Sequence, residues 1–165
     1  MTDYRTLDQA DVKGKRVLVR ADLNVPLDGG RVAEATRIEA TLPTIRWIVE
    51  HKGRAILASH LGRPKGERNP KYSLKPVAAY LATLLGRDVP LAPDCVGPEA
   101  EQMASALKDG DVMMLENLRF HAGEEKNDPS FAHSSTSSSV SFWGMTVRRV
   151  IARKIVAIHR RSSRL

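Results

Sequence analysis

The sequence predicts an α/β protein with three layers, in which a parallel sheet carries helices on both faces. Short apolar runs typical of buried strands alternate with longer segments whose apolar residues recur at helical spacing. The connections between these segments are short and rich in turn-forming residues, which favours strand–helix–strand units. An apolar fraction of 42% and a charged fraction of 27% agree with an ordinary globular chain.

The first predicted strand covers residues 17–19, and a helix follows from Thr36, which has capping-box spacing to Glu39. Gly53 is expected to end this helix, before a second strand over 55–58. The remaining predicted elements are a helix capped by Ser73 and stopped by Gly86, a weak strand over 89–92, a helix from Pro98 to near Gly110, a strand over 112–115, and a helix beginning at Asp128-Pro129.

The net charge of +7 is confined to one end of the chain. Residues 1–132 hold 19 basic and 19 acidic residues, a difference of zero, whereas residues 133–165 hold seven basic residues and no acidic one. The apolar periodicity also stops near residue 132, and residues 134–141 read SSTSSSVS. We therefore expect a partial α/β domain over 1–132 and a basic Ser/Arg-rich tail over 133–165 that is disordered or translated out of frame.

Several classes of protein are excluded by what the sequence lacks. Its one cysteine, Cys95, cannot form an intrachain disulfide or a thiolate cluster, and the histidines lack metal-ligand spacing, so we expect no metal site. No apolar run approaches the ~20 residues of a membrane span, and we expect a cytoplasmic protein. Neither GxxxxGK[ST] nor a GxGxxG after a strand occurs, so no nucleotide site is predicted in this chain.

Polar residues follow the predicted strands at the point where each strand ends. Ligands of open parallel sheets bind at this edge, and arginine side chains grip phosphate and carboxylate oxygens bidentately. The sequence therefore predicts a pocket for a small, doubly anionic ligand, although any one of these residues alone could be a solvated strand end. The residues expected at this edge are Arg20, Asp22, Asn24, Arg37, His60, Arg63, Lys65, Asn117, Arg119 and His121.

Three of these segments resemble motifs of the phosphoglycerate kinase family. Residues 20–26 read RADLNVP, residues 59–64 read SHLGRP and residues 115–120 read LENLRF, followed by EEKND over 124–128. Arg37 lies in a TRI context, as it does in that family. The order and spacing of the motifs agree, and the resemblance covers residues from about 12 to 132. Residues 133–165 do not match the family.

The resemblance implies an enzyme that moves a phosphoryl group between 1,3-bisphosphoglycerate and ADP, giving 3-phosphoglycerate and ATP. It places Asp22 and Asn24 at the carboxylate and hydroxyl region of the substrate, and it gives Arg37 the catalytic role of stabilising charge on the phosphoryl group in transit. The substrate-binding set that it implies is Asp22, Leu23, Asn24, Arg37, His60, Leu61, Gly62, Arg63 and Arg119.

The resemblance also implies partners and cofactors. The family enzyme uses Mg-ATP and ADP, which bind a second domain, so no nucleotide is expected to bind this chain on its own, and the chain is expected to be inactive alone. The family is usually monomeric, and we expect neither a specific nucleic acid nor a membrane as partner. The alternative is a protein whose basic tail binds nucleic acid or an anionic membrane, because seven positive charges give salt-sensitive attraction to polyanions.

Overall fold

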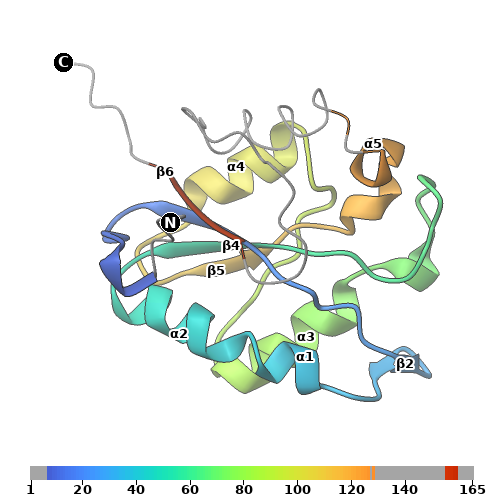
Figure 1. Ribbon diagram of the computed structural model, residues 1–165, viewed down its shortest axis with the longest axis horizontal. Helices are drawn as coiled ribbons and strands as arrows, with labels where there is room; N and C mark the ends of the chain where they lie inside the picture. Colours follow the sequence, from blue (N-terminus) through green and yellow to red (C-terminus); the bar gives the residue numbers. More distant parts are fainter. Residues whose placement is uncertain (1–6, 127, 129–154, 160–165) are drawn as a thin grey trace, which may run out of the picture.

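A computed structural model describes residues 7–126, 128 and 155–159. Strands β1 (Arg16–Arg20), β4 (Arg54–Ala58) and β5 (Val112–Met114) pair in parallel in the order β5-β4-β1 (Figure 1). Strand β6 (Ile155–His159) lies antiparallel to β1 at the edge of this sheet. The three apolar runs predicted as the main strands thus form the expected parallel sheet, and β6, which was not predicted, makes the whole sheet mixed.

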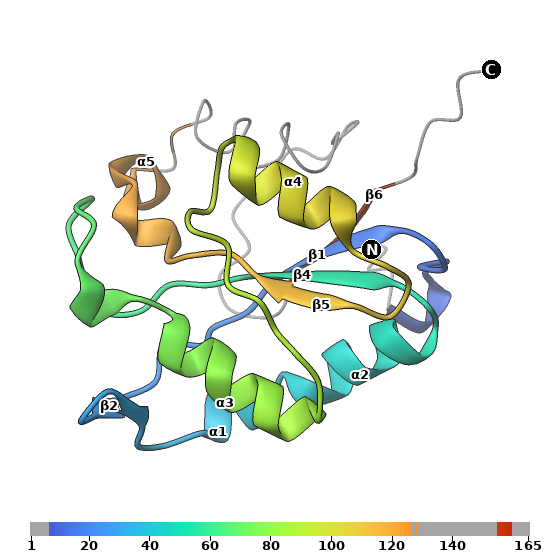
Figure 2. The ribbon, with the colours of Figure 1, turned by 180° about the vertical axis from the view of Figure 1, so that it is seen from behind.

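Helices cover both faces of the sheet, as Figures 1 and 2 show. Helices α1 (Thr36–Glu39), α2 (Leu42–Glu50) and α3 (Lys75–Leu85) lie on one face, and α4 (Pro98–Ala106) and α5 (Ala122–Glu125) lie on the other. The predicted three-layer α/β fold is confirmed. The smaller elements are the hairpin of β2 (Leu27–Asp28) and β3 (Arg31–Val32) and the single 3₁₀ turns η1 (Leu7–Gln9), η2 (Pro70–Tyr72) and η3 (Leu118–Phe120).

Alternate residues of each strand pack on opposite faces, because successive side chains of a strand point to opposite sides. Val19 and Leu57 join the core beneath α2 and α3, whereas Ile56 and Met113 join the core beneath α4. All four side chains are completely buried. Burial on both faces explains why these strands are continuous apolar runs in the sequence rather than alternating ones.

The predicted helix after β1 is divided into two. Pro43 lies in the first turn of α2 and has no N–H to donate to the carbonyl of Glu39, so the chain turns between α1 and α2. The predicted capping box is absent, because Ala35 and not Thr36 is the N-cap of α1. Lys52 takes the left-handed conformation after α2, and Gly53 is required for space, since a Cβ there would lie 2.7 Å from Cγ2 of Ile48.

The later elements follow the prediction only in part. Leu74, and not Ser73, is the N-cap of α3, α4 ends at Ala106 rather than near Gly110, and α5 was not predicted. Pro98 begins α4, and Gly86 ends α3 in the left-handed conformation. The weak strand expected over 89–92 is reduced to one bridge between Leu91 and Met114, because Pro90 lacks the N–H that a full strand needs. The helix expected from Asp128-Pro129 and most of the tail lie outside the described residues. Among the residues that are described, no helix is long and apolar enough to cross a membrane.

The side chain of Asn117, which follows β5, ties three loops together. Its Nδ2 donates to the carbonyl oxygens of Leu61 and Tyr72, at 2.8 Å each, and its Oδ1 accepts from the backbone N–H of Arg119 at 3.0 Å. The residue is completely buried. Next to it, the carboxylate of Glu116 accepts from the N–H of Leu74 and from the hydroxyl of Ser73, which fixes the start of α3. These hydrogen bonds offset the free-energy cost of removing the Asn117 and Glu116 side chains from water.

Replacing Asn117 with Asp is predicted to lower the free energy of unfolding by at least about 2 kcal/mol. A carboxylate cannot donate, so the carbonyls of Leu61 and Tyr72 would each lose a partner and face a negative charge. Urea denaturation followed by circular dichroism measures the change. Asn69→Asp is the matched control, because the Asn69 side chain only accepts a hydrogen bond, from the N–H of Lys71. Equal effects of the two substitutions would contradict this account.

Candidate functional site

The carboxyl ends of β1, β4 and β5 meet at one edge of the sheet, and side chains as well as backbone hold the loops together there. The N–H of Leu23 donates to Oγ of Ser59 at 3.0 Å, and the N–H of Leu118 donates to the carbonyl of Ser59 at 3.1 Å. Oδ1 of Asn24 accepts from the N–H of Gly62 at 2.9 Å. The three segments that carry the predicted site are therefore neighbours, and we call their edge of the sheet the rim.

Arg37 approaches the rim from α1. Its guanidinium lies 2.8 Å from the carboxylate of Asp22 and donates to the carbonyl of Asn24 at 3.2 Å. About half of each side chain of this ion pair is exposed, so solvent and a ligand can both reach the guanidinium. Asp22 also accepts from the N–H of Asn24, which holds the turn after β1.

Glu124 of α5 lies between two arginines that come from different strand ends. It forms a close ion pair with Arg20 of β1, and its second oxygen lies 3.4 Å from Nε of Arg119. The side chain of Glu124 is only 11% exposed, so these charges attract one another with reduced solvent screening. Arg119 also donates to the carbonyl of Gly62 at 3.1 Å. The Glu124 carboxylate lies between two guanidinium groups, where the oxygens of an anionic ligand could also bind.

The loop after β4 presents one half-buried and one exposed basic side chain. Burial and the nearby Arg119 guanidinium lower the pKa of His60 below its ordinary value, against the opposing influence of the Asp22 and Glu124 carboxylates. His60 is therefore neutral near pH 7 until another negative charge approaches. Arg63 is exposed, and within the described residues no ion pair or hydrogen bond holds its guanidinium.

Gly62 shapes this loop through its backbone. It has a φ of 62°, and a Cβ at this position would lie 2.5 Å from the ring of Tyr72. Leu23 and Leu61 are buried, so they could meet a ligand only through backbone groups, and the carbonyl of Leu61 is already bonded to Asn117.

Not every polar residue expected at the rim lies there. Asn117 is internal and holds the loops instead of facing solvent. His121 bonds to Asp94 through Nε2 at 2.7 Å, in a group with Cys95 that is the candidate metal-binding cluster among the described residues. Burial and the Asp94 carboxylate raise the pKa of the Cys95 thiol far above its ordinary range, so the uncoordinated thiol is protonated and a poor nucleophile at neutral pH.

The role of Glu124 at the rim was not predicted from the sequence. Glu124 and Glu125 appeared only as part of a resembling stretch, and nothing in their local pattern indicates which arginines they meet. The signal that could have found Glu124 is charge balance, since arginines gathered at one edge need counter-ions. The rim as a whole can bind and orient a small polyanion, with guanidinium groups as donors and carboxylates as exchangeable counter-ions.

Comparison with known proteins shows which family this sequence is similar to. Residues 7–141 match the family model "Phosphoglycerate kinase". The chain is 61% identical over 133 residues to a phosphoglycerate kinase of Methylorubrum extorquens and 57% identical over 133 residues to a cytosolic phosphoglycerate kinase of Triticum aestivum. Each alignment covers 80% of this chain and 33% of the relative, so the chain spans about one third of the length of these relatives.

Solved structures resemble the fold over the same extent. The crystal structure of phosphoglycerate kinase from Pyrococcus horikoshii matches 80% of this chain and 34% of its own with a TM-score of 0.71 and 30% identity. The structure of phosphoglycerate kinase from Coxiella burnetii matches 82% of this chain and 33% of its own with a TM-score of 0.71 and 33% identity. With the match of the family model over most of the chain, these likenesses show that the chain belongs to the phosphoglycerate kinase family.

Proposed function

We propose that this chain supplies the phosphoglycerate-binding half of an enzyme that transfers a phosphoryl group between 1,3-bisphosphoglycerate and ADP. The observation that carries the proposal is the convergence of Arg20, Arg37 and Arg119 on one edge of the sheet from separate segments. Arg63 lies exposed in the loop after β4, at the same edge. A substrate with a carboxylate at one end and a phosphate at the other fits such a set of donors. Family membership supports the same substrate class.

In this proposal the two ends of the substrate meet different groups of the rim. Asp22 and Asn24 lie beside one another after β1 and would receive the hydroxyl and carboxylate region, with Leu23 supporting them from the core. His60, Arg63 and Arg119 would hold phosphate or carboxylate oxygens, with Leu61 and Gly62 setting the course of their loop. The substrate would displace Glu124 from part of its contact with Arg119.

Arg37 would act on the phosphoryl group as it moves. Its guanidinium is about half exposed and is held at the rim by Asp22, so it can share its charge between that carboxylate and the oxygens of the moving group. Catalysis of phosphoryl transfer consists mainly of positioning and of neutralising charge on those oxygens. Arg37 is therefore the proposed catalytic residue of this chain.

Phosphoglycerate kinases use Mg-ATP and ADP, which supply or accept the phosphoryl group. The loops after β1, β4 and β5 contain no phosphate-binding glycine pattern, and we propose that the nucleotide binds a part of the enzyme outside this chain. The ligand of this chain is then a small molecule rather than a nucleic acid or a membrane, and the proposed compartment is the cytoplasm, in keeping with the wheat relative named cytosolic.

Replacing Arg63 with Met is predicted to weaken binding of 3-phosphoglycerate by at least about tenfold, because a hydrogen bond to a charged group contributes about 1.5–3 kcal/mol. Isothermal titration calorimetry of the 165-residue chain measures the dissociation constant. Lys108→Met is the matched control, since it removes one exposed positive charge near the start of β5, at the opposite edge of the sheet. A similar loss of affinity in both variants would show that binding follows net charge and not the rim.

The His60 ring reports directly on an anion at the rim. In the free chain its pKa is expected below the ordinary value of about 6.5, and binding of 3-phosphoglycerate should raise it, because the negative charges of the ligand stabilise the imidazolium. The chemical shift of the His60 ring proton, followed against pH with and without 3-phosphoglycerate, gives both pKa values. An unchanged pKa in the presence of saturating ligand would place the ligand away from His60.

The 165-residue chain by itself is predicted to form no ATP from 1,3-bisphosphoglycerate and ADP, because the proposed half-site holds only one of the two substrates. A coupled assay of ATP formation tests this, with buffer in place of the chain as the blank. ATP formation that increases in proportion to the concentration of the chain would contradict the proposal and would require a nucleotide site within it.

A further inference from the structure

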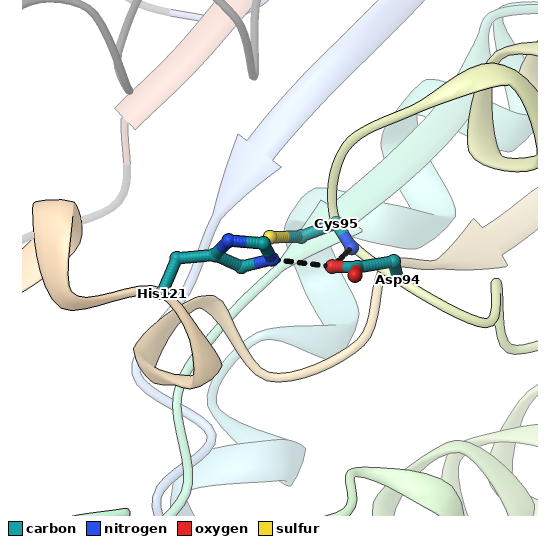
Figure 3. Close-up of side chains that lie close together, drawn as sticks. All are labelled: Asp94, Cys95 and His121. Atoms are coloured by element: carbon teal, nitrogen blue, oxygen red, sulfur yellow. Dashed lines mark hydrogen bonds and ion pairs between the residues drawn. The ribbon is translucent and has the colours of Figure 1, made fainter. Parts of the chain in front are cut away.

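Two loops next to the rim bring a carboxylate, a thiol and an imidazole together. Asp94 and Cys95 belong to the loop before α4, and His121 follows η3, so the histidine lies 27 residues from Asp94 in the sequence (Figure 3). The donor atoms of the three side chains all lie within 4.8 Å of one another. This separation in sequence explains why no metal-ligand spacing was visible in the chain.

We propose that Asp94, Cys95 and His121 form a binding site for one divalent transition-metal ion of the zinc class. Thiolate, imidazole and carboxylate are the ligands that Zn²⁺ takes in proteins, at about 2.0–2.3 Å, which puts tetrahedral donors about 3.3–3.8 Å apart. The donors here lie within 4.8 Å of one another, and Nε2 of His121 and Oδ1 of Asp94, which share a hydrogen bond at 2.7 Å, would move apart to that spacing to admit the ion. Three protein ligands leave a fourth position for water, the arrangement of open zinc sites.

The surroundings suit an ion that enters from solvent. Cys95 is 2% exposed and would bind from the side of the core beneath α4, whereas the side chains of Asp94 and His121 are about one third exposed. Arg68 lies 3.5 Å from Oδ2 of Asp94, the oxygen that does not contact His121. Arg68 can therefore hold the carboxylate in place while Oδ1 binds the ion, as second-shell partners of metal ligands do.

The sulfur donor decides the class of ion. Mg²⁺ and Ca²⁺ prefer oxygen ligands, while thiolate and imidazole favour Zn²⁺ and its neighbours in the first transition series. On binding, the thiol of Cys95 loses its proton to solvent, and neutral His121 carries its remaining proton on Nδ1, so that Nε2 faces the ion. Each bound ion thus brings two positive charges and releases one proton.

Cobalt(II) tests the proposal, because a thiolate bound to Co²⁺ gives a charge-transfer absorption that oxygen and nitrogen ligands do not. The metal-free 165-residue chain is titrated with Co²⁺, and the expected result is one equivalent of bound ion with this absorption. Zn²⁺ added afterwards should displace the Co²⁺ and abolish the band. No charge-transfer absorption at any Co²⁺ concentration that saturates the chain would overturn the proposal.

Two variants and one control locate the site. Cys95→Ser should abolish the charge-transfer band, and His121→Gln should weaken Zn²⁺ binding by at least about tenfold, since even second-shell changes cost about 10–100-fold in metal affinity. His51→Gln is the control, because this histidine stacks on Trp47 away from the cluster. The His121 variant keeps the test decisive should the Cys95 variant fail to fold. Unchanged Zn²⁺ affinity in folded His121→Gln would overturn the site.

Discussion

The rim depends on one buried amide, that of Asn117. Its two donated hydrogen bonds fix the loop after β4, through Leu61, and the segment before α3, through Tyr72. Its carbonyl oxygen fixes the backbone at Arg119. Because unpaired buried polar groups are costly, these loops can take only an arrangement in which all three bonds form. The arginines that follow β4 and β5 are thus positioned by a side chain that itself never reaches the ligand side of the rim.

Three of the four arginines at the rim are paired with protein carboxylates before any ligand arrives. Asp22 pairs with Arg37, and Glu124 is shared between Arg20 and Arg119. Such pairs keep the guanidinium groups oriented without a ligand. In the proposed complex, oxygens of the bound polyanion replace protein carboxylates as partners of these guanidinium groups. The net charge of the chain therefore says little about the site, because residues 1–132 carry equal numbers of basic and acidic residues. Recognition of an anionic ligand would depend on where the arginines lie and not on an excess of basic over acidic residues in the chain.

The apolar pattern predicted the layers and the three parallel strands, because strands that are buried on both faces are continuous apolar runs in the sequence. It did not predict features that depend on partners far away in the chain. Asn117 was expected at the rim with its neighbours, but its side-chain amide donates both of its hydrogen bonds to backbone carbonyls that are distant in the sequence. The missing N–H of Pro43 could have predicted that the helix is divided there. The capping-box spacing at Thr36 predicted the wrong N-cap, because Ala35 begins α1. The contacts of Glu124, and the meeting of His121 with Asp94, arise only when the loops fold together.

On the proposal made above, a small phosphorylated acid binds at the rim and not at the basic residues of 133–165. Amide chemical-shift mapping of the ¹⁵N-labelled chain during titration with 3-phosphoglycerate tests it most directly. We expect saturable shifts concentrated at residues 22–24, 37, 60–63 and 119. Shifts confined to residues 133–165, or shifts that grow linearly without saturation at the rim, would contradict it.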